Sequence, residues 1–404
     1  MENVRKNSGM IKAVTAVIFV SAALYAFGNT LIYTLINYVI DAFSLKGTAE
    51  GIMSSLLSAG MMIAQLSSPS LQGRIRKFSM IGIACLIQGV ALLVCGIAAG
   101  PVLFGAGSFV LGLGCGWLDG YMNSIIIDLY PENSARPMLT LHALYGVGSL
   151  LTPVIVKLLL PGMGWRGPYF LVASFLIALT VIVFLLKKRT ESTGALKTAA
   201  EEPLKMADIG RYLKKRRTVL LLLVSMLSGA LGQTGILTWI VRYMTVTFDA
   251  ESLGTTCITL FWVFATVNRL VVPNIKVKPM KMIVGGSFIF AAAVFIGVLS
   301  HNPVVMAVAV SVCGLCSGHF YPMLFMEAAE GYKGSTTMTT AVMQFVMGIG
   351  RVVIPLIAAF VSSISNASVG MILPGFTVLA GAVIGLIVLS DSRKEEIKGR
   401  MDNE

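Results

Sequence analysis

Twelve long apolar stretches run through this sequence, and they constrain its fold more than any other feature. Each is near or above the roughly 20 residues that a helix needs to cross the hydrocarbon core of a bilayer. They lie at about 11–40, 49–70, 79–99, 101–130, 137–160, 167–187, 218–247, 252–272, 281–299, 303–330, 335–364 and 368–390. Only 12% of the residues are charged, against about 25% in an average soluble domain. The sequence therefore predicts an all-α membrane protein with twelve transmembrane helices.

Basic residues are distributed unevenly over the loops between these stretches. When the loops are numbered alternately from the N-terminus, one side holds 25 of the 31 lysines and arginines, and the other side holds only 4. The positive-inside rule then predicts a multi-pass protein of the cytoplasmic membrane with both termini in the cytoplasm. The net charge of +12 is thus a topology signal and does not indicate a nucleic-acid partner, although the basic loops can contact anionic membrane lipids.

The longest hydrophilic stretch, residues 187–217, divides the chain into two sets of six stretches. We predict an N-terminal half at 1–186, a cytoplasmic linker at 187–217, and a C-terminal half with a short cytoplasmic tail at 218–404. A shift of 202 residues superimposes the halves without a gap over more than forty residues. The matched pairs are Gly112 with Gly314, Leu113 with Leu315, Gly116 with Gly318, Gly146 with Gly348, Gly148 with Gly350, and Pro153 with Pro355.

Six plus six helices, parallel halves and a long central linker resemble the major facilitator superfamily over the whole chain. The basic loops "QGRIRKFS" at 72–79 and "NIKVKPMK" at 274–281 resemble a degenerate form of the loop motif of that superfamily. The resemblance implies two pseudo-symmetric six-helix halves that rock around a site near the middle of the membrane, which is secondary active transport by alternating access.

The segment "GWLDGYMNSIIIDLYPENS" at 116–134 is similar to the fourth helix of the fucose–proton symporter branch of that superfamily. "LTLHALYGVGSLLTP" at 139–153 and "GHFYPMLF" at 318–325 fit its fifth and tenth helices. The resemblance implies that Asp119 takes the coupling proton. It also places Tyr33 where those symporters carry a second carboxylate.

Polar residues recur at helical spacing on otherwise apolar stretches, and lipid-facing polar stripes would be costly. We therefore expect these stripes to face a watery cavity or one another. The predicted substrate-binding residues are Asn29, Tyr33, Asn123, Tyr145, Gln233, Trp262, Tyr321, Gln344 and Arg351. Trp262 can stack on a sugar ring or simply pack.

Asp119 and His142 are the predicted proton-coupling residues. A charge at the bilayer centre costs roughly 2.5–3.5 kcal/mol on insertion scales, so Asp119 must be paired, protonated or hydrated. The alternative is that Asp119 forms a structural ion pair between the halves. His142 is either a proton relay or a neutral hydrogen-bonding side chain.

Arg351 is a second charge near the middle of its stretch. It can bind a substrate carboxylate, pair with Asp119, or pack against backbone carbonyls. Arg269 lies nearer the cytoplasmic end of its stretch, and we assign it with Asp128 and Glu327 to an inner gate. The alternative for Asp128 is that it stabilises the end of its own helix.

The sequence contains no phosphate-binding glycine loop, metal-ligand cluster or nucleophile–base pair, so we expect no enzyme activity, cofactor or metal. The predicted function is transport of a sugar or another small polar metabolite, coupled to protons, by a monomer. The alternatives are a proton-driven exporter of amphipathic compounds, or a carrier of an organic anion or acidic sugar anchored by Arg351.

Overall fold

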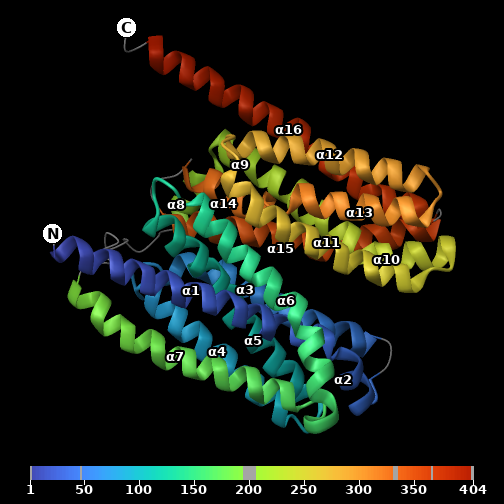
Figure 1. The fold of residues 1–404 in the computed structure, drawn as a ribbon, viewed down its shortest axis with the longest axis horizontal. Coiled ribbons are helices and arrows are strands. Elements are labelled where there is room, and N and C mark those ends of the chain that lie inside the picture. Colours follow the sequence, from blue (N-terminus) through green and yellow to red (C-terminus); the bar gives the residue numbers. More distant parts are fainter. Residues whose placement is uncertain (1, 46–47, 194–205, 331–334, 365–366, 402–404) are drawn as a thin grey trace. The chain divides into compact units, whose positions relative to one another are not determined.

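The computed structural model describes residues 2–45, 48–193, 206–330, 335–364 and 367–401, and all its regular elements are helices (Figure 1). Side chains are described throughout these ranges except at 2–8, 37, 48–54, 189–193, 206, 351–352, 354–356, 358–364 and 395–401. The chain forms two compact units. The first comprises Met1–Met206 and Gly334–Val342, and the second comprises Ala207–Lys333 and Met343–Glu404. The expected all-α fold class is confirmed.

The first unit is a bundle of long helices that follows the predicted stretches closely. Its helices are α1 (Glu2–Thr34), α2 (Ile36–Ala42), α3 (Thr48–Leu71), α4 (Lys77–Ile97), α5 (Pro101–Leu129), α6 (Ala135–Met163) and α7 (Gly167–Thr193). Within it α5 packs between α3 and α4, α4 packs on α7, and α1 packs on α6 (Figure 1).

The second unit is a second bundle, with two interruptions that hydropathy does not predict. Its elements are α8 (Met206–Leu213), α9 (Arg216–Val224), the π-helix η1 (Ser225–Gln233), α10 (Thr234–Phe248), α11 (Glu251–Val271), the short η2 (Val272–Asn274), α12 (Pro279–Leu299), α13 (Pro303–Ser317), α14 (Phe320–Glu330), α15 (Thr336–Ile364) and α16 (Ala367–Met401). The first residues of α15, up to Val342, belong to the first unit by their contacts. One predicted stretch thus contains a π-helix, and another breaks at Gly318 and His319.

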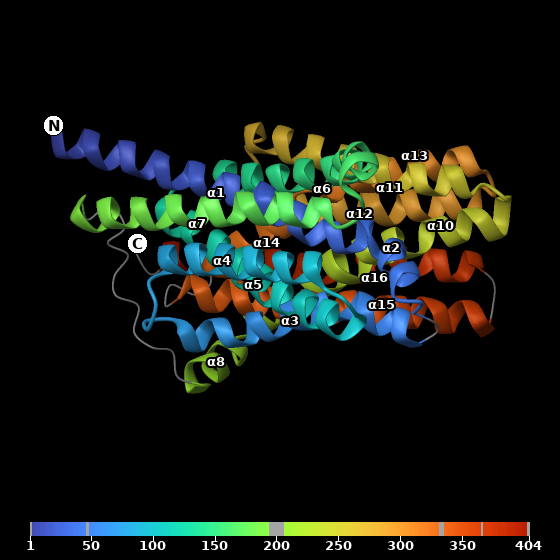
Figure 2. The same cartoon turned by 90° about the horizontal axis from the view of Figure 1, so that it is seen from below.

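The two units use the same packing pairs. In the first, α5 packs on both α3 and α4, and α4 packs on α7; in the second, α13 packs on both α11 and α12, and α12 packs on α16. Figure 2 shows the pairs α3 with α5 and α11 with α13 lying side by side. The 202-residue repeat seen in the sequence therefore has a counterpart in the helix packing.

Glycines at equivalent positions of the two repeats explain how closely the helices of these pairs approach each other. A Cβ added at Gly112 would overlap the carbonyl oxygen of Leu57 on α3, and one added at Gly314 would overlap the carbonyl oxygen of Phe261 on α11. Small residues allow such backbone approach in membrane bundles, where van der Waals packing replaces the hydrophobic drive between helices. The glycines of the repeat are thus contact points between helices.

Ten helices in the part of the chain searched are long and apolar enough to span a membrane. They account for ten of the twelve predicted stretches. The remaining two correspond to α3 and α15, which are helical over 24 and 29 residues and contain side chains outside the described set.

Candidate functional site

Polar side chains of α1 and α6 meet inside the first unit. Asn29 Nδ2 donates a hydrogen bond to Tyr145 Oη at 2.9 Å, and the rings of Tyr25 and Tyr145 lie 5.0 Å apart. Their four-residue spacing along α1 puts Tyr25 and Asn29 on one helix face. Tyr33, one turn further, is 44% exposed and lies 3.3 Å from Ser58 Oγ. The structure therefore brings Asn29 and Tyr145 together and leaves Tyr33 at the edge.

A chain of hydrogen bonds joins α5 to α6 through a buried amide. Asn123 Nδ2 donates to the backbone carbonyl of Asp119 at 2.8 Å and to Asp119 Oδ1 at 3.0 Å. Asn123 Oδ1 lies 3.0 Å from His142 Nε2. Because the carbonyl can only accept, the amide nitrogen must point toward Asp119, and the amide oxygen must face His142. His142 therefore donates from Nε2.

This arrangement links two titratable groups through a side chain that does not titrate. Asp119 and His142 occupy opposite ends of the Asn123 amide, whose side chain is fully buried. A change of charge at one end alters the polarisation of the amide felt at the other end. Asp119 lies about 27 Å along α5, which is about 44 Å long at 1.5 Å per residue, so this chain lies deep within the spanning helix.

Asp128, assigned from sequence to an inner gate, forms an ion pair within the first unit. Its Oδ2 lies 2.6 Å from Lys77 Nζ, and Thr336 Oγ1 hydrogen-bonds to both residues. Ser124, one turn before Asp128 on α5, also lies 2.7 Å from Thr336 Oγ1. All four residues belong to the first unit. Lys77 and Asp128 are thus a largely buried ion pair capped by the first turn of α15.

We expect Lys77→Met to destabilise the folded protein strongly, because it leaves the Asp128 carboxylate buried without its cation. Breaking a buried pair on one side costs about 3–5 kcal/mol, whereas replacing both partners by apolar residues costs far less. Lys77→Met/Asp128→Leu should therefore recover much of the lost stability. Heating in detergent followed by size-exclusion chromatography measures the surviving folded fraction. The exposed Arg74→Met, in the loop just before α4, is the control, and equal losses in Lys77→Met and Arg74→Met would contradict the pairing.

In the second unit, two predicted site residues donate hydrogen bonds to backbone carbonyls at the break between α13 and α14. Gln233 Nε2 donates to the Ser317 carbonyl at 2.7 Å, and Arg269 Nε donates to the Gly318 carbonyl at 2.8 Å. A broken helix frees backbone carbonyls that must find donors inside the protein, because lipid offers none. Arg269 also lies 5.9 Å from the Trp262 ring centroid. Both buried polar side chains thus hold an interrupted helix.

The other predicted residues of this unit have separate environments. Tyr321 lies beside η1, since a Cβ added at Gly229 would stand 3.7 Å from its ring. Gln344 is buried, and neither of its amide atoms has a hydrogen-bond partner among the described atoms. Glu327 Oε2 accepts from Arg217 Nη2 at 2.8 Å. The side chain of Arg351 lies outside the described residues, so its three alternatives stay predictions, as does a single chamber lined from both halves.

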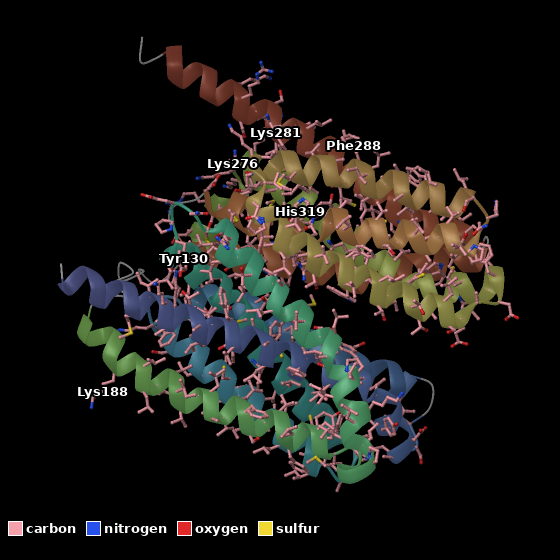
Figure 3. The ribbon with its side chains drawn as sticks, viewed as in Figure 1. Tyr130, Lys188, Lys276, Lys281, Phe288 and His319 are labelled. Carbon is pink, nitrogen blue, oxygen red and sulfur yellow. The ribbon has the colours of Figure 1, made fainter. Side chains whose placement is uncertain are left out.

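Sequence reasoning missed several polar residues that the structure places in defined contacts. Lys77 and Arg217 were counted only as loop charges, although each pairs with a buried carboxylate. His319, labelled in Figure 3, is buried with Nδ1 3.1 Å from Asn268 Oδ1. Lys77 and Arg217 lie within two residues of the start of the apolar stretches at 79–99 and 218–247, and that position is the one signal that could have marked them.

Comparison with known proteins decides what kind of molecule this is. The family model described as Major Facilitator Superfamily matches residues 18–339, which is most of the chain. The chain belongs to the Major Facilitator Superfamily. It is therefore a multi-pass membrane protein and a secondary transporter, not an enzyme, and it handles small-molecule substrates as the members of this family do.

The relatives of this superfamily member are distant in sequence but similar over their length. The glucose/mannose transporter GlcP of Bacillus subtilis (strain 168) is 20% identical over 397 residues, covering 94% of this chain and 98% of that protein. The gentisate transporter of Corynebacterium glutamicum is 25% identical over 335 residues, covering 79% and 73%. The structure of the transporter FucP in the outward conformation has a TM-score of 0.76 at 17% identity, covering 93% of this chain and 98% of that one. The expected resemblance to the fucose–proton symporter is confirmed at the level of fold.

Proposed function

We propose that this superfamily member carries a sugar or another small polar metabolite across the cytoplasmic membrane together with protons. The similarity to a glucose/mannose transporter over nearly the whole chain supports the solute class. The fold shared with a fucose:proton symporter supports the coupling ion. The observation that carries the proposal is the chain Asp119–Asn123–His142, which connects two proton-binding groups deep in the first unit.

Buried amide atoms without partners support a polar solute. Asn29 Oδ1 and both amide atoms of Gln344 are buried and have no hydrogen-bond partner among the described atoms. Buried polar groups normally have partners, because an unpaired one costs about 1–3 kcal/mol. At either residue, a hydroxyl group can donate to the amide oxygen, and at Gln344 it can also accept from the amide nitrogen, which suits a sugar better than an apolar drug.

The same geometry gives Asp119 a coupling role. When Asp119 is protonated, the solute-loaded site is neutral while the halves rock around it, whereas a carboxylate would keep a charge near the centre of the membrane. Asn123 holds the carboxyl group in place and joins it to His142. Release of the solute and the proton on the other side, followed by return of the empty carrier without the proton, completes a cycle that moves a proton with each solute molecule.

Transport in proteoliposomes tests the function. A thermal-shift screen of the purified protein against sugars, sugar acids and amphipathic drugs first identifies the solute, since a bound ligand raises stability by mass action. With an acidic outside, we expect uphill uptake of that solute, accompanied by acidification of the lumen. Proton movement opposite to the solute would indicate the exporter, and transport unaffected by the pH gradient would contradict proton coupling.

A carrier of an organic anion is the second candidate, favoured by the similarity to a gentisate transporter. In that case sugar acids or aromatic acids should stabilise the protein more than neutral sugars do. Arg351→Gln should then abolish the stabilisation by acids. Stabilisation by acids that survives Arg351→Gln would contradict an anion anchored at this residue.

We propose that both termini lie in the cytoplasm, and cysteine labelling tests this orientation. Lys188→Cys lies at the exposed end of α7 (Figure 3), and Ser252→Cys lies at the exposed start of α11. With an impermeant maleimide on intact cells, Ser252→Cys should react and Lys188→Cys should react only after the cells are opened. We expect the native cysteines to react little with the maleimide, since five are buried and Cys316 is half-buried. The reverse pattern would overturn the orientation.

A further inference from the structure

A pocket of about 350 Å³ lies in the second unit, where α9 packs on α16. Its lining residues are Arg216, Arg217, Leu220, Val388, Asp391, Ser392 and Lys394. Three of these seven side chains are basic and one is acidic. We call its three basic side chains the basic rim, and Leu220 and Val388 add apolar side chains to the lining.

The position of this pocket follows from the chain. α9 begins at Arg216, where a candidate membrane span begins, and the span within α16 reaches Lys394. The pocket therefore lies where two spanning helices pass from apolar to polar sequence. Lys214 and Lys215 precede it directly, so the basic rim continues along the chain.

Existing contacts hold the rim in shape. Arg217 Nη1 donates to Ser392 Oγ at 2.7 Å, and Arg217 Nη2 pairs with Glu327 at 2.8 Å. A further donor, Arg217 Nε, is buried without a partner among the described atoms. Arg216 Nε pairs with Asp391 at 3.0 Å, but its side chain is 73% exposed. Arg217 is thus held in place with its Nε donor unused, and Arg216 and Lys394 are exposed and accessible to a ligand.

We propose that this pocket binds the phosphate group of an anionic glycerophospholipid. Arginine and lysine are the usual partners of phosphate oxygens, and guanidinium groups bind them with directed hydrogen bonds. Leu220 and Val388 give the glycerol and the first methylenes of an acyl chain an apolar surface, which a free phosphate ion would not use. Basic pockets between spanning helices on the cytoplasmic side are suited to lipid headgroups.

Native mass spectrometry of the full chain tests this site. The protein in neutral detergent is mixed with phosphatidylglycerol or with phosphatidylcholine of the same chains. We expect the wild type to retain phosphatidylglycerol in preference to phosphatidylcholine. In Arg216→Gln/Lys394→Gln, the apparent affinity for phosphatidylglycerol should fall on the order of tenfold or more, with little change for phosphatidylcholine.

The matched control removes two basic residues of the second unit that do not line the pocket. Lys276→Gln/Lys281→Gln takes two exposed charges, labelled in Figure 3, from outside the pocket. It should bind phosphatidylglycerol as the wild type does. An equal loss in the control would mean a diffuse basic surface and would overturn the pocket, as would unchanged binding in the pocket variant.

Two further measurements distinguish a lipid ligand from a soluble phosphate and check that the variants are folded. Inorganic phosphate and glycerol 1-phosphate are tested by thermal shift; if they stabilise the wild type and phosphatidylglycerol does not, the ligand is a soluble phosphate and the lipid proposal is wrong. The variants' melting temperatures in phosphatidylcholine alone check folding. If the double variant is unfolded, Lys394→Gln alone should still lower phosphatidylglycerol binding severalfold, and no change there would overturn the proposal.

Discussion

Asp119→Asn should abolish uphill uptake while largely sparing solute binding and the exchange of solute at equal concentrations. Asn keeps the shape of the side chain and imitates the protonated acid, so the loaded carrier can still cross the membrane. It cannot release a proton, so the gradient no longer drives accumulation. Proteoliposomes measure both modes, with and without a pH gradient. The expected loss of uphill uptake is essentially complete.

The same variant distinguishes the structural alternative. If Asp119 instead paired with a buried cation, its neutralisation would leave that charge unpaired, and folded yield and every transport mode would fall together. Asp41→Asn, at the exposed end of α2, is the control and should leave uptake unchanged. Normal proton-driven uptake in Asp119→Asn would exclude both roles.

Gly112→Ala should lower thermal stability markedly, and Gly314→Ala should do the same. In each case the added methyl overlaps a carbonyl oxygen of the neighbouring helix, Leu57 in the first unit and Phe261 in the second. Overpacking of this kind costs about 1–3 kcal/mol, because backbone cannot move aside as a side-chain tip can. Thermal unfolding in detergent, followed by tryptophan fluorescence, measures the loss.

Gly285→Ala is the matched control for these two substitutions. Gly285 lies within α12, and an added Cβ there would meet no atom within 4 Å. This change should be neutral or stabilising by about 0.5–1 kcal/mol, since Ala favours a helix over Gly. If all three variants lost stability alike, helix propensity or membrane insertion would be the cause, and the close contacts would carry no special weight.

The fold could be predicted from sequence because the bilayer imposes a length and an apolar composition on each span. The faces of α1 and α6 were also predictable, since Asn29 and Tyr145 follow polar stripes at helical spacing and do meet. Hydropathy averages over whole turns, so it does not detect a change in hydrogen-bond register. The π-helix at 225–233 and the break after Ser317 therefore escaped prediction.

Charged residues at the ends of spans were the least predictable part of the site. Lys77 and Arg217 contribute to the positive-inside count whether or not they are paired, so the count gives no information about Asp128 or Glu327. Their pairing depends on which helices are neighbours, and only the tertiary structure supplies that. The Asp119–Asn123 spacing was visible in sequence, but the bond from Asn123 to His142 joins two helices and was not.

α16 is one uninterrupted helix of 35 residues from Ala367 to Met401, and its apolar part ends near residue 390. At 1.5 Å per residue, the rest forms a rod about 16 Å long outside the hydrocarbon layer. A rod continuous with a spanning helix acts as a pointer, because any tilt inside the bilayer is transmitted to its tip. A fluorophore fused in helical register after Met401 should therefore report turnover by its polarisation, and a few glycines inserted at the base of the rod should silence that signal without slowing transport.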